Sequence, residues 1–182
     1  MDSLEAVEKM ISKLTSGAAL ALCLTASAAV AQESTNRVAA NTDWSVFEET
    51  NPKECWAVSA PKETLNTRDG NVVAVRRGEI LLMVFNRPDS GVSSQVAFTG
   101  GYPFAGGSTV SLAIGDTTYE LFTEGEWAWP ATPEDDARIV AAMKRGADAT
   151  LTARSARGTT TKDTFSLLGF TAAVEEAATR CS

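Results

Sequence analysis

Apolar residues recur along most of the chain at every second position, which is the period of a β-strand with one buried face. Turn residues such as Asn51-Pro52 and Asp69-Gly70 separate the runs. The pattern predicts strands at residues 43–48, 54–59, 71–78, 80–85, 93–98, 110–114, 117–122, 148–155 and 159–165. The run at 80–85 is apolar on both faces, which indicates a strand in the middle of the fold.

Two segments have the spacing of amphipathic helices instead. The first begins at Pro133, with Thr132 as its N-cap, and Gly146 closes it. The second extends from about residue 168 to residue 179, with Ser166 as its candidate cap. The predicted fold class is therefore mainly β: a single-domain antiparallel β-sandwich with two short helices, one mid-chain and one C-terminal.

Five glycines between Thr99 and Asp116 raise the question of a phosphate-binding loop. Such a loop leads into a helix and carries a lysine that meets the phosphate charge. Here the glycines lie between strand runs, and residues 90–111 contain no lysine or arginine. Gly115-Asp116 separates two alternating runs, as in a tight hairpin. We therefore interpret the glycines as turn residues.

The first residues differ in composition from the rest of the chain. From Leu14 to Ala31 the sequence is uncharged, small and apolar, and Ala29-Val30-Ala31 has the pattern of a cleavage site. This predicts a signal peptide at 1–31, cut between Ala31 and Gln32, with Met10 as the true start because acidic residues precede it. A flexible leader at 32–42 and one domain at 43–182 follow, with no transmembrane segment after cleavage.

Charge and composition narrow the classes of function. The 182 residues carry a net charge of -7, with a pI near 4.7, which argues against nucleic acid as a partner. The chain has no histidine, and so it lacks the commonest general base and the commonest metal ligand. No motif for a serine nucleophile, a metal or a cofactor is found, and we expect no catalytic residues, no metal and no cofactor.

The cysteines predict one disulfide. Cys23 lies inside the predicted signal peptide, which leaves Cys55 and Cys181 in the mature chain. An even pair of cysteines in an exported protein is typical of a disulfide bond. Closing a loop of about 125 residues is worth on the order of 5 kcal/mol in the loop-entropy model, as an upper figure.

Four aromatic residues are candidate ligand contacts. Trp127 and Trp129 lie on one face if their segment is extended. We expect them to be buried beneath the helix that begins soon after them, and stacking on a ligand is the alternative. Tyr102 and Phe104 either contact a ligand at the surface or fold back onto the core. All four are ligand contacts only if they are exposed.

Charged residues have structural explanations that we favour over catalysis. The acidic pairs Glu124/Glu126 and Asp135/Asp136 fit alternating strand exposure and the electrostatics of a helix N-terminus, respectively. Acid–base catalysis by either pair is the alternative. Five arginines in or beside predicted strands are expected to be solvated charges or to protect sheet edges; they are Arg68, Arg76, Arg77, Arg154 and Arg157.

Taken together in order and spacing, four stretches resemble the invasion-associated locus B family of exported alphaproteobacterial proteins. They are "DWSVF" with "ECWAVS", "GGYPFAGGSTVSLAIGDTTYELF", "ARIVAAMKRGADATLTARSARGTTTKDTFSL" and "SLLGFTAAVEEA". The likeness covers about Asp43 to Cys181. It implies a compact β-sandwich in the periplasm or at the cell surface, without a defined catalytic activity. Family members often have more cysteines around the central hairpin than this chain has.

These observations lead to one preferred hypothesis and one alternative. The preferred hypothesis is an exported, non-enzymatic protein, periplasmic or at the cell surface or secreted, that binds an envelope or cell-surface component. The alternative is a periplasmic enzyme. A carboxylate-dependent hydrolase would need two carboxylates that face each other in a cleft. A thiol redox protein would need an accessible thiolate.

Overall fold

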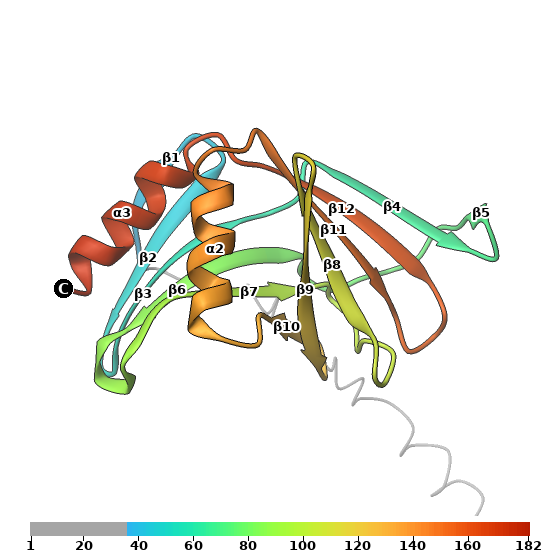
Figure 1. Cartoon of the computed structure of the whole chain (residues 1–182), viewed down its shortest axis with the longest axis horizontal. Coiled ribbons are helices and arrows are strands. Elements are labelled where there is room, and N and C mark those ends of the chain that lie inside the picture. Colours follow the sequence, from blue (N-terminus) through green and yellow to red (C-terminus); the bar gives the residue numbers. More distant parts are fainter. Residues whose placement is uncertain (1–35) are drawn as a thin grey trace, which may run out of the picture. The chain divides into compact units, whose positions relative to one another are not determined.

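A computed structural model describes residues 36–182 of the chain. The predicted signal peptide, its start at Met10 and its cleavage site between Ala31 and Gln32 lie outside the described residues. The described part forms one sheet with two helices of eleven residues, α2 (Pro133–Met143) and α3 (Phe170–Arg180) (Figure 1). The predicted fold class is confirmed, with one helix mid-chain and one C-terminal.

The twelve strands are all joined by antiparallel pairing. Their order in the sheet is β1-β2-β3-β6-β7-β10-β9-β8-β11-β12-β4-β5. In chain order the strands are β1 (Arg37–Asn41), β2 (Trp44–Thr50), β3 (Lys53–Ser59), β4 (Glu63–Arg68), β5 (Asn71–Val72), β6 (Leu81–Arg87), β7 (Val92–Thr99), β8 (Thr109–Ile114), β9 (Thr117–Glu124), β10 (Trp127–Trp129), β11 (Asp148–Arg154) and β12 (Thr160–Ser166). A 3₁₀ turn, η1 (Pro88–Ser90), joins β6 to β7.

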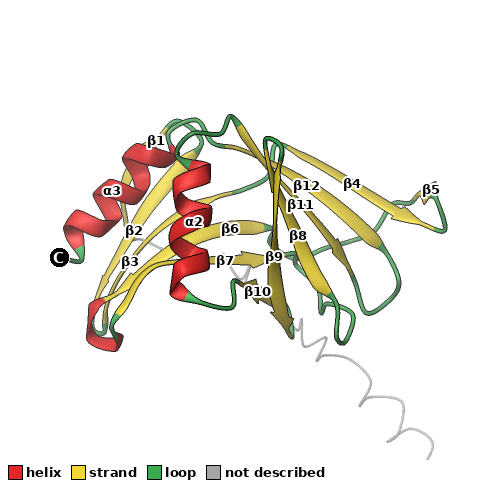
Figure 2. Ribbon diagram, in the orientation of Figure 1, coloured by secondary structure: helices red, strands yellow, loops and turns green. Residues whose placement is uncertain are grey.

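The sandwich is made by one continuous sheet that bends back on itself. Strands β6 and β7 run at a steep angle to β8 and β9 (Figure 2). Phe98 of β7 meets Phe165 of β12 edge to face, with 6.2 Å between ring centroids, and both rings are fully buried. The inner faces of the two halves of the sheet therefore share one hydrophobic core.

Both helices pack on the inner side of the β1–β7 half of the sheet. Helix α3 contacts β1, β2 and β3, and α2 contacts β7 (Figure 1). At the start of α3, Phe170 packs edge to face on Trp44 of β2 at 4.8 Å, and the Trp44 indole donates to the Ser166 carbonyl at 3.0 Å. The helices bury the inner aromatic and aliphatic side chains that the opposite half of the sheet does not reach.

The predicted helix ends are only partly correct. Thr132 caps α2, since its hydroxyl accepts a hydrogen bond from the Asp135 backbone N–H, and Pro133 is the first helical residue. Ser166 does not cap α3. Its hydroxyl accepts from the Leu168 N–H in the preceding turn, and Gly169 is the residue at the N-cap position.

The strands of the structure differ from the predicted ones in several places, and β10 is one strand that was not predicted. The flexible leader predicted at 32–42 is wrong over β1, because Arg37–Asn41 pair with β2 along the edge of the sheet. Strand β4 was not predicted, since its one large apolar residue, Leu65, faces solvent. The strand predicted at 71–78 is reduced to β5, and residues 73–80 form an irregular segment. Each difference arises from pairing or contacts with distant parts of the chain.

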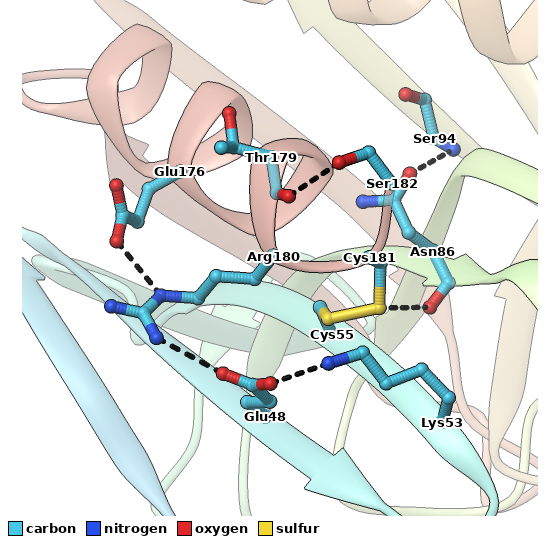
Figure 3. The surroundings of a disulfide bond; sticks show 10 residues. All are labelled: Glu48, Lys53, Cys55, Asn86, Ser94, Glu176, Thr179, Arg180, Cys181 and Ser182. Atoms are coloured by element: carbon cyan, nitrogen blue, oxygen red, sulfur yellow. Dashed lines mark hydrogen bonds and ion pairs between the residues drawn. A yellow bond between two sulfur atoms is a disulfide. The ribbon is translucent and has the colours of Figure 1, made fainter.

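The predicted disulfide between Cys55 and Cys181 is present and anchors the end of α3 to β3 (Figure 3). Arg180, beside it, pairs with Glu48 of β2 at 3.0 Å and with Glu176 of its own helix at 2.8 Å. Lys53 also pairs with Glu48, and the hydrogen bonds from Lys53 and Arg180 lower the pKa of that carboxyl. The C-terminal helix is thus held at its end by a covalent bond and a small ion-pair network.

Reduction of the disulfide is expected to lower the free energy of unfolding by about 2–5 kcal/mol, because the open unfolded chain gains conformational entropy. Urea denaturation with and without a reductant measures this. The Cys55→Ala/Cys181→Ala double variant is the control, and a reductant should leave its midpoint unchanged. Equal midpoints for the oxidised and reduced wild type would contradict the expectation.

The glycine-rich stretch forms turns, as predicted. Gly115-Asp116 joins β8 to β9 in a tight hairpin, with Ile114 paired to Thr117. Gly101 lies against the irregular segment, where the Gly78 N–H donates to the Gly101 carbonyl at 2.9 Å. A Cβ at Gly101 would lie 2.6 Å from the Gly78 oxygen. This close approach of two backbones requires glycine at position 101.

Gly101→Ala is expected to destabilise the fold more than Gly107→Ala. Both glycines have φ of +72°, so the left-handed backbone costs each variant about 1–2 kcal/mol. Only Gly101→Ala adds a clash, because a Cβ at Gly107 meets no atom within 4 Å. Urea denaturation of the two variants gives the difference, and equal losses of stability would show that the Gly78–Gly101 contact is not tight.

Candidate functional site

Trp127 and Trp129 lie on the outer face of the sheet. Strand β10 pairs with β7 so that Ala128 is opposite Phe98, and Ala128 is therefore the residue that points into the core. Trp127 is 41% exposed and Trp129 is half-buried. The expectation that these rings are buried beneath the helix is wrong for Trp127, whereas Trp129 is half-buried and lines a groove together with the start of α2.

The two tryptophans line a groove of about 330 Å³ together with Phe85, Arg87, Gln95 and Ala97 of β6 and β7. A second groove of about 330 Å³ also has Trp129 in its lining. Gln95 and Trp129 line both grooves, and exposed Phe122 of β9 and the start of α2 complete the second. Trp129 thus stands between two hollows on the surface.

The aromatic surface continues from Phe85 across two more strands, β3 and β2. Phe47 of β2 stacks on Trp56 of β3, with 5.4 Å between centroids and 9° between ring planes, and Trp56 lies 6.1 Å from Phe85 of β6. The Arg87 guanidinium lies 4.4 Å above the Phe85 ring. The sheet register places Phe47 opposite Trp56 and Trp56 opposite Phe85.

We call this surface the outer aromatic face, and its residues are Phe47, Trp56, Phe85, Phe122, Trp127 and Trp129. The sequence analysis missed the first four. A usable signal was present, because aromatic residues occupy positions out of phase with the buried residues of the same strands, as Trp56 does between Cys55 and Ala57. Alternation alone places such rings outside the core.

Tyr102 and Phe104 do not belong to the outer aromatic face. Phe104 is 7% exposed and packs against Phe98 in the core, so it does not meet the condition of exposure for a ligand contact. Tyr102 is half-buried, and its hydroxyl hydrogen-bonds to that of Thr161 at 2.5 Å. Burial raises the pKa of Tyr102. Tyr102 lines a separate pocket. The Arg77 guanidinium in this pocket lies over the Tyr102 ring, 5.1 Å from the ring centroid.

In neither acidic pair do the two carboxylates face each other across a cleft. Glu124 and Glu126 are both exposed near the hairpin between β9 and β10. Asp135 pairs with Arg138 on the surface, whereas Asp136 is 7% exposed and accepts a hydrogen bond from the Val96 N–H at 2.7 Å. Burial raises the pKa of Asp136 to about 6, against the opposing effect of the Val96 hydrogen bond.

The titration of Asp136 is expected to make stability depend on pH. Its carboxyl ionises near pH 4 in the unfolded chain but only near pH 6 in the folded protein, so ionisation of the unfolded state lowers stability as the pH rises over this range. Asp136→Asn removes this dependence. The unfolding free energy of the variant relative to wild type should rise from pH 4 to about pH 6 and then level off, as measured by urea denaturation.

Asp135→Asn is the matched control, because the Arg138 hydrogen bond lowers the pKa of Asp135. The stability that this carboxylate contributes is lost as the pH falls below about 4, so the variant-minus-wild-type difference should decrease with rising pH in that range and stay flat between pH 4 and pH 6. The same slope for both variants would contradict the assignment of the raised pKa to Asp136.

Two kinds of site are absent from residues 36–182. No group of three or more histidine, cysteine, aspartate or glutamate side chains is arranged there to hold a metal ion. Within the same residues, no helix has the length and apolar character needed to span a membrane.

The fold and this surface define an antiparallel β protein with a filled inner face and an aromatic outer face. Comparison with protein families gives a match at residues 44–178 to the family described as invasion associated locus B (IalB) protein. The chain belongs to this family. Comparisons with curated proteins and with solved structures find no match.

Proposed function

We propose that this member of the invasion associated locus B family is an exported, non-enzymatic protein that binds an envelope or cell-surface component through its outer aromatic face. The observation that carries the proposal is the position of Trp127 and Trp129, which line a groove of about 330 Å³ on the outer face of the sheet. Tryptophan is among the residues that contribute most to binding energy at interfaces.

The make-up of this face suits a binding surface. Rings with few rotatable bonds bury a large area at a low cost in conformational entropy. Phe122 is 51% exposed and Trp127 is 41% exposed, which is a large apolar exposure for neighbouring strands. Gln95 and Arg87 lie in the same groove and supply polar groups that can orient a ligand.

The disulfide supports export, because such bonds form and persist in oxidising compartments. Neither enzymatic alternative gains support. Asp136 is buried against β7 while Asp135 pairs with Arg138, so this pair does not form a carboxylate dyad. Cys55 and Cys181 are joined to each other, and so neither is a thiolate nucleophile while the bond is intact.

The test is binding of the exported protein to envelope fractions. We expect the protein in the periplasmic or extracellular fraction, and we expect it to co-sediment with outer-membrane vesicles or with peptidoglycan sacculi of the producing bacterium. Trp127→Ala/Trp129→Ala should weaken this binding at least about tenfold, since each aromatic hot spot contributes on the order of 2 kcal/mol. Thermal unfolding should remain cooperative, because the rings lie outside the core.

Leu168→Ala is the matched control, because Leu168 is 63% exposed and lies outside the outer aromatic face. It should leave binding unchanged. A protein retained in the cytoplasm would contradict export. Binding to neither fraction, or equal binding by the double variant and the wild type, would contradict the docking surface.

A further inference from the structure

A pocket of about 290 Å³ opens where β4, the irregular segment and the turn between β11 and β12 meet. Four arginines line it: Arg68, Arg76, Arg77 and Arg157. They come from three separate parts of the chain. From the sequence, we expected these arginines to be solvated charges or to protect sheet edges. In a protein with a net charge of -7, this concentration of positive charge is the strongest local departure from the overall balance that we find.

Arg77 builds the inner wall of the pocket. Its guanidinium forms two parallel hydrogen bonds with Asp163 of β12, at 2.7 and 2.6 Å, and also donates to Asn66 of β4 and to the Gly100 carbonyl. The Arg77 side chain is 6% exposed, and the Asp163 side chain is fully buried. This pair is neutral as a whole and fixed in place, so it gives the pocket a rigid wall, against which the ring of Tyr102 is stacked.

The other three guanidiniums are exposed and almost free of countercharge. Arg68 donates to the Thr159 hydroxyl at 2.8 Å. Between residues 36 and 182, the side chains of Arg76 and Arg157 have neither a hydrogen bond nor an ion pair. Glu126 is the one acidic residue in the lining, and it forms no ion pair with any of the arginines.

Like charges held around one pocket repel each other, and an anion between them would remove that repulsion. Guanidinium groups match the geometry of phosphate and carboxylate oxygens. Three exposed arginines against one glutamate leave a surplus of two positive charges in the lining, which favours a dianion over a single carboxylate. Val75, Pro103 and the Tyr102 ring add apolar walls that can hold the organic part of a ligand.

We propose that this pocket binds a phosphate monoester, with Arg68, Arg76 and Arg157 as its cationic contacts. The volume fits one phosphate group with a small organic moiety. The pocket shares no lining residue with the two grooves of the outer aromatic face, so this site is independent of the docking surface proposed above.

Calorimetric and NMR titrations of the purified full-length chain at low ionic strength test the proposal. The soluble probes are inorganic phosphate and glucose 1-phosphate, and vesicles containing phosphatidic acid present the same group on a lipid. Saturable binding to glucose 1-phosphate indicates a soluble or sugar-borne phosphate. Binding to the vesicles alone indicates a lipid headgroup, and both results support the site.

Arg76→Gln/Arg157→Gln should weaken this binding at least about tenfold, since charge-assisted hydrogen bonds are lost. Arg145→Gln/Arg154→Gln is the matched control, because it removes the same charge from arginines outside the pocket lining. It should bind as wild type does, and so should Trp127→Ala/Trp129→Ala. No binding to any of the three probes, or equal weakening by the pocket pair and the control pair, would overturn the proposal.

Discussion

The structure depends on one constraint: the single sheet folds over itself, so that the side chains of its two halves fill one shared core. Phe98 and Phe165 meet where the two halves come together, and Trp44 with Phe170 fills the part covered by α3. Because strand side chains alternate, each residue placed in that core sends its neighbours to the opposite surface. The outer aromatic face is therefore fixed by the same register that builds the core. Because Ala128 of β10 points into the core, its neighbours Trp127 and Trp129 point to the outer face.

The Arg77–Asp163 pair holds the irregular segment between β5 and β6 in place. The irregular segment 73–80 must cross from the β4–β5 end of the sheet to β6, and only its first residue, Val73, donates a backbone hydrogen bond to a strand, at Asn66 of β4. Arg77 ties this segment to β12, to β4 and to the turn at Gly100, while Gly78 bonds to Gly101. Buried charges of this kind are tolerated only when they are paired and hydrogen-bonded. The arginine pocket is built on this anchor, so fold and candidate site share one set of contacts there.

The sequence predicted features that are encoded locally. Thr132-Pro133 starts a helix and Gly115-Asp116 turns a hairpin because the signals lie within a few residues of each other. The direction of Trp127 depends instead on pairing with β7, some thirty positions earlier, and the burial of Arg77 depends on Asp163, 86 positions later. Likewise, β1 and β4 have little apolar alternation and exist because neighbouring strands supply hydrogen-bond partners. Composition could reveal the aromatic and arginine residues, but only the fold brings them together.

The Cys55–Cys181 bond closes residues 55–181 into a covalent ring. All strands from β6 to β12, with β4, β5 and both helices, lie inside the ring, and among the described residues only β1, β2 and the first residues of β3 lie outside it on the N-terminal side. A force applied between residues 36 and 182 is therefore transmitted through the disulfide bond and does not extend the chain between Cys55 and Cys181. Among the described residues, such a force can extend β1, β2 and the first residues of β3, whereas the covalent bond prevents extension of the rest.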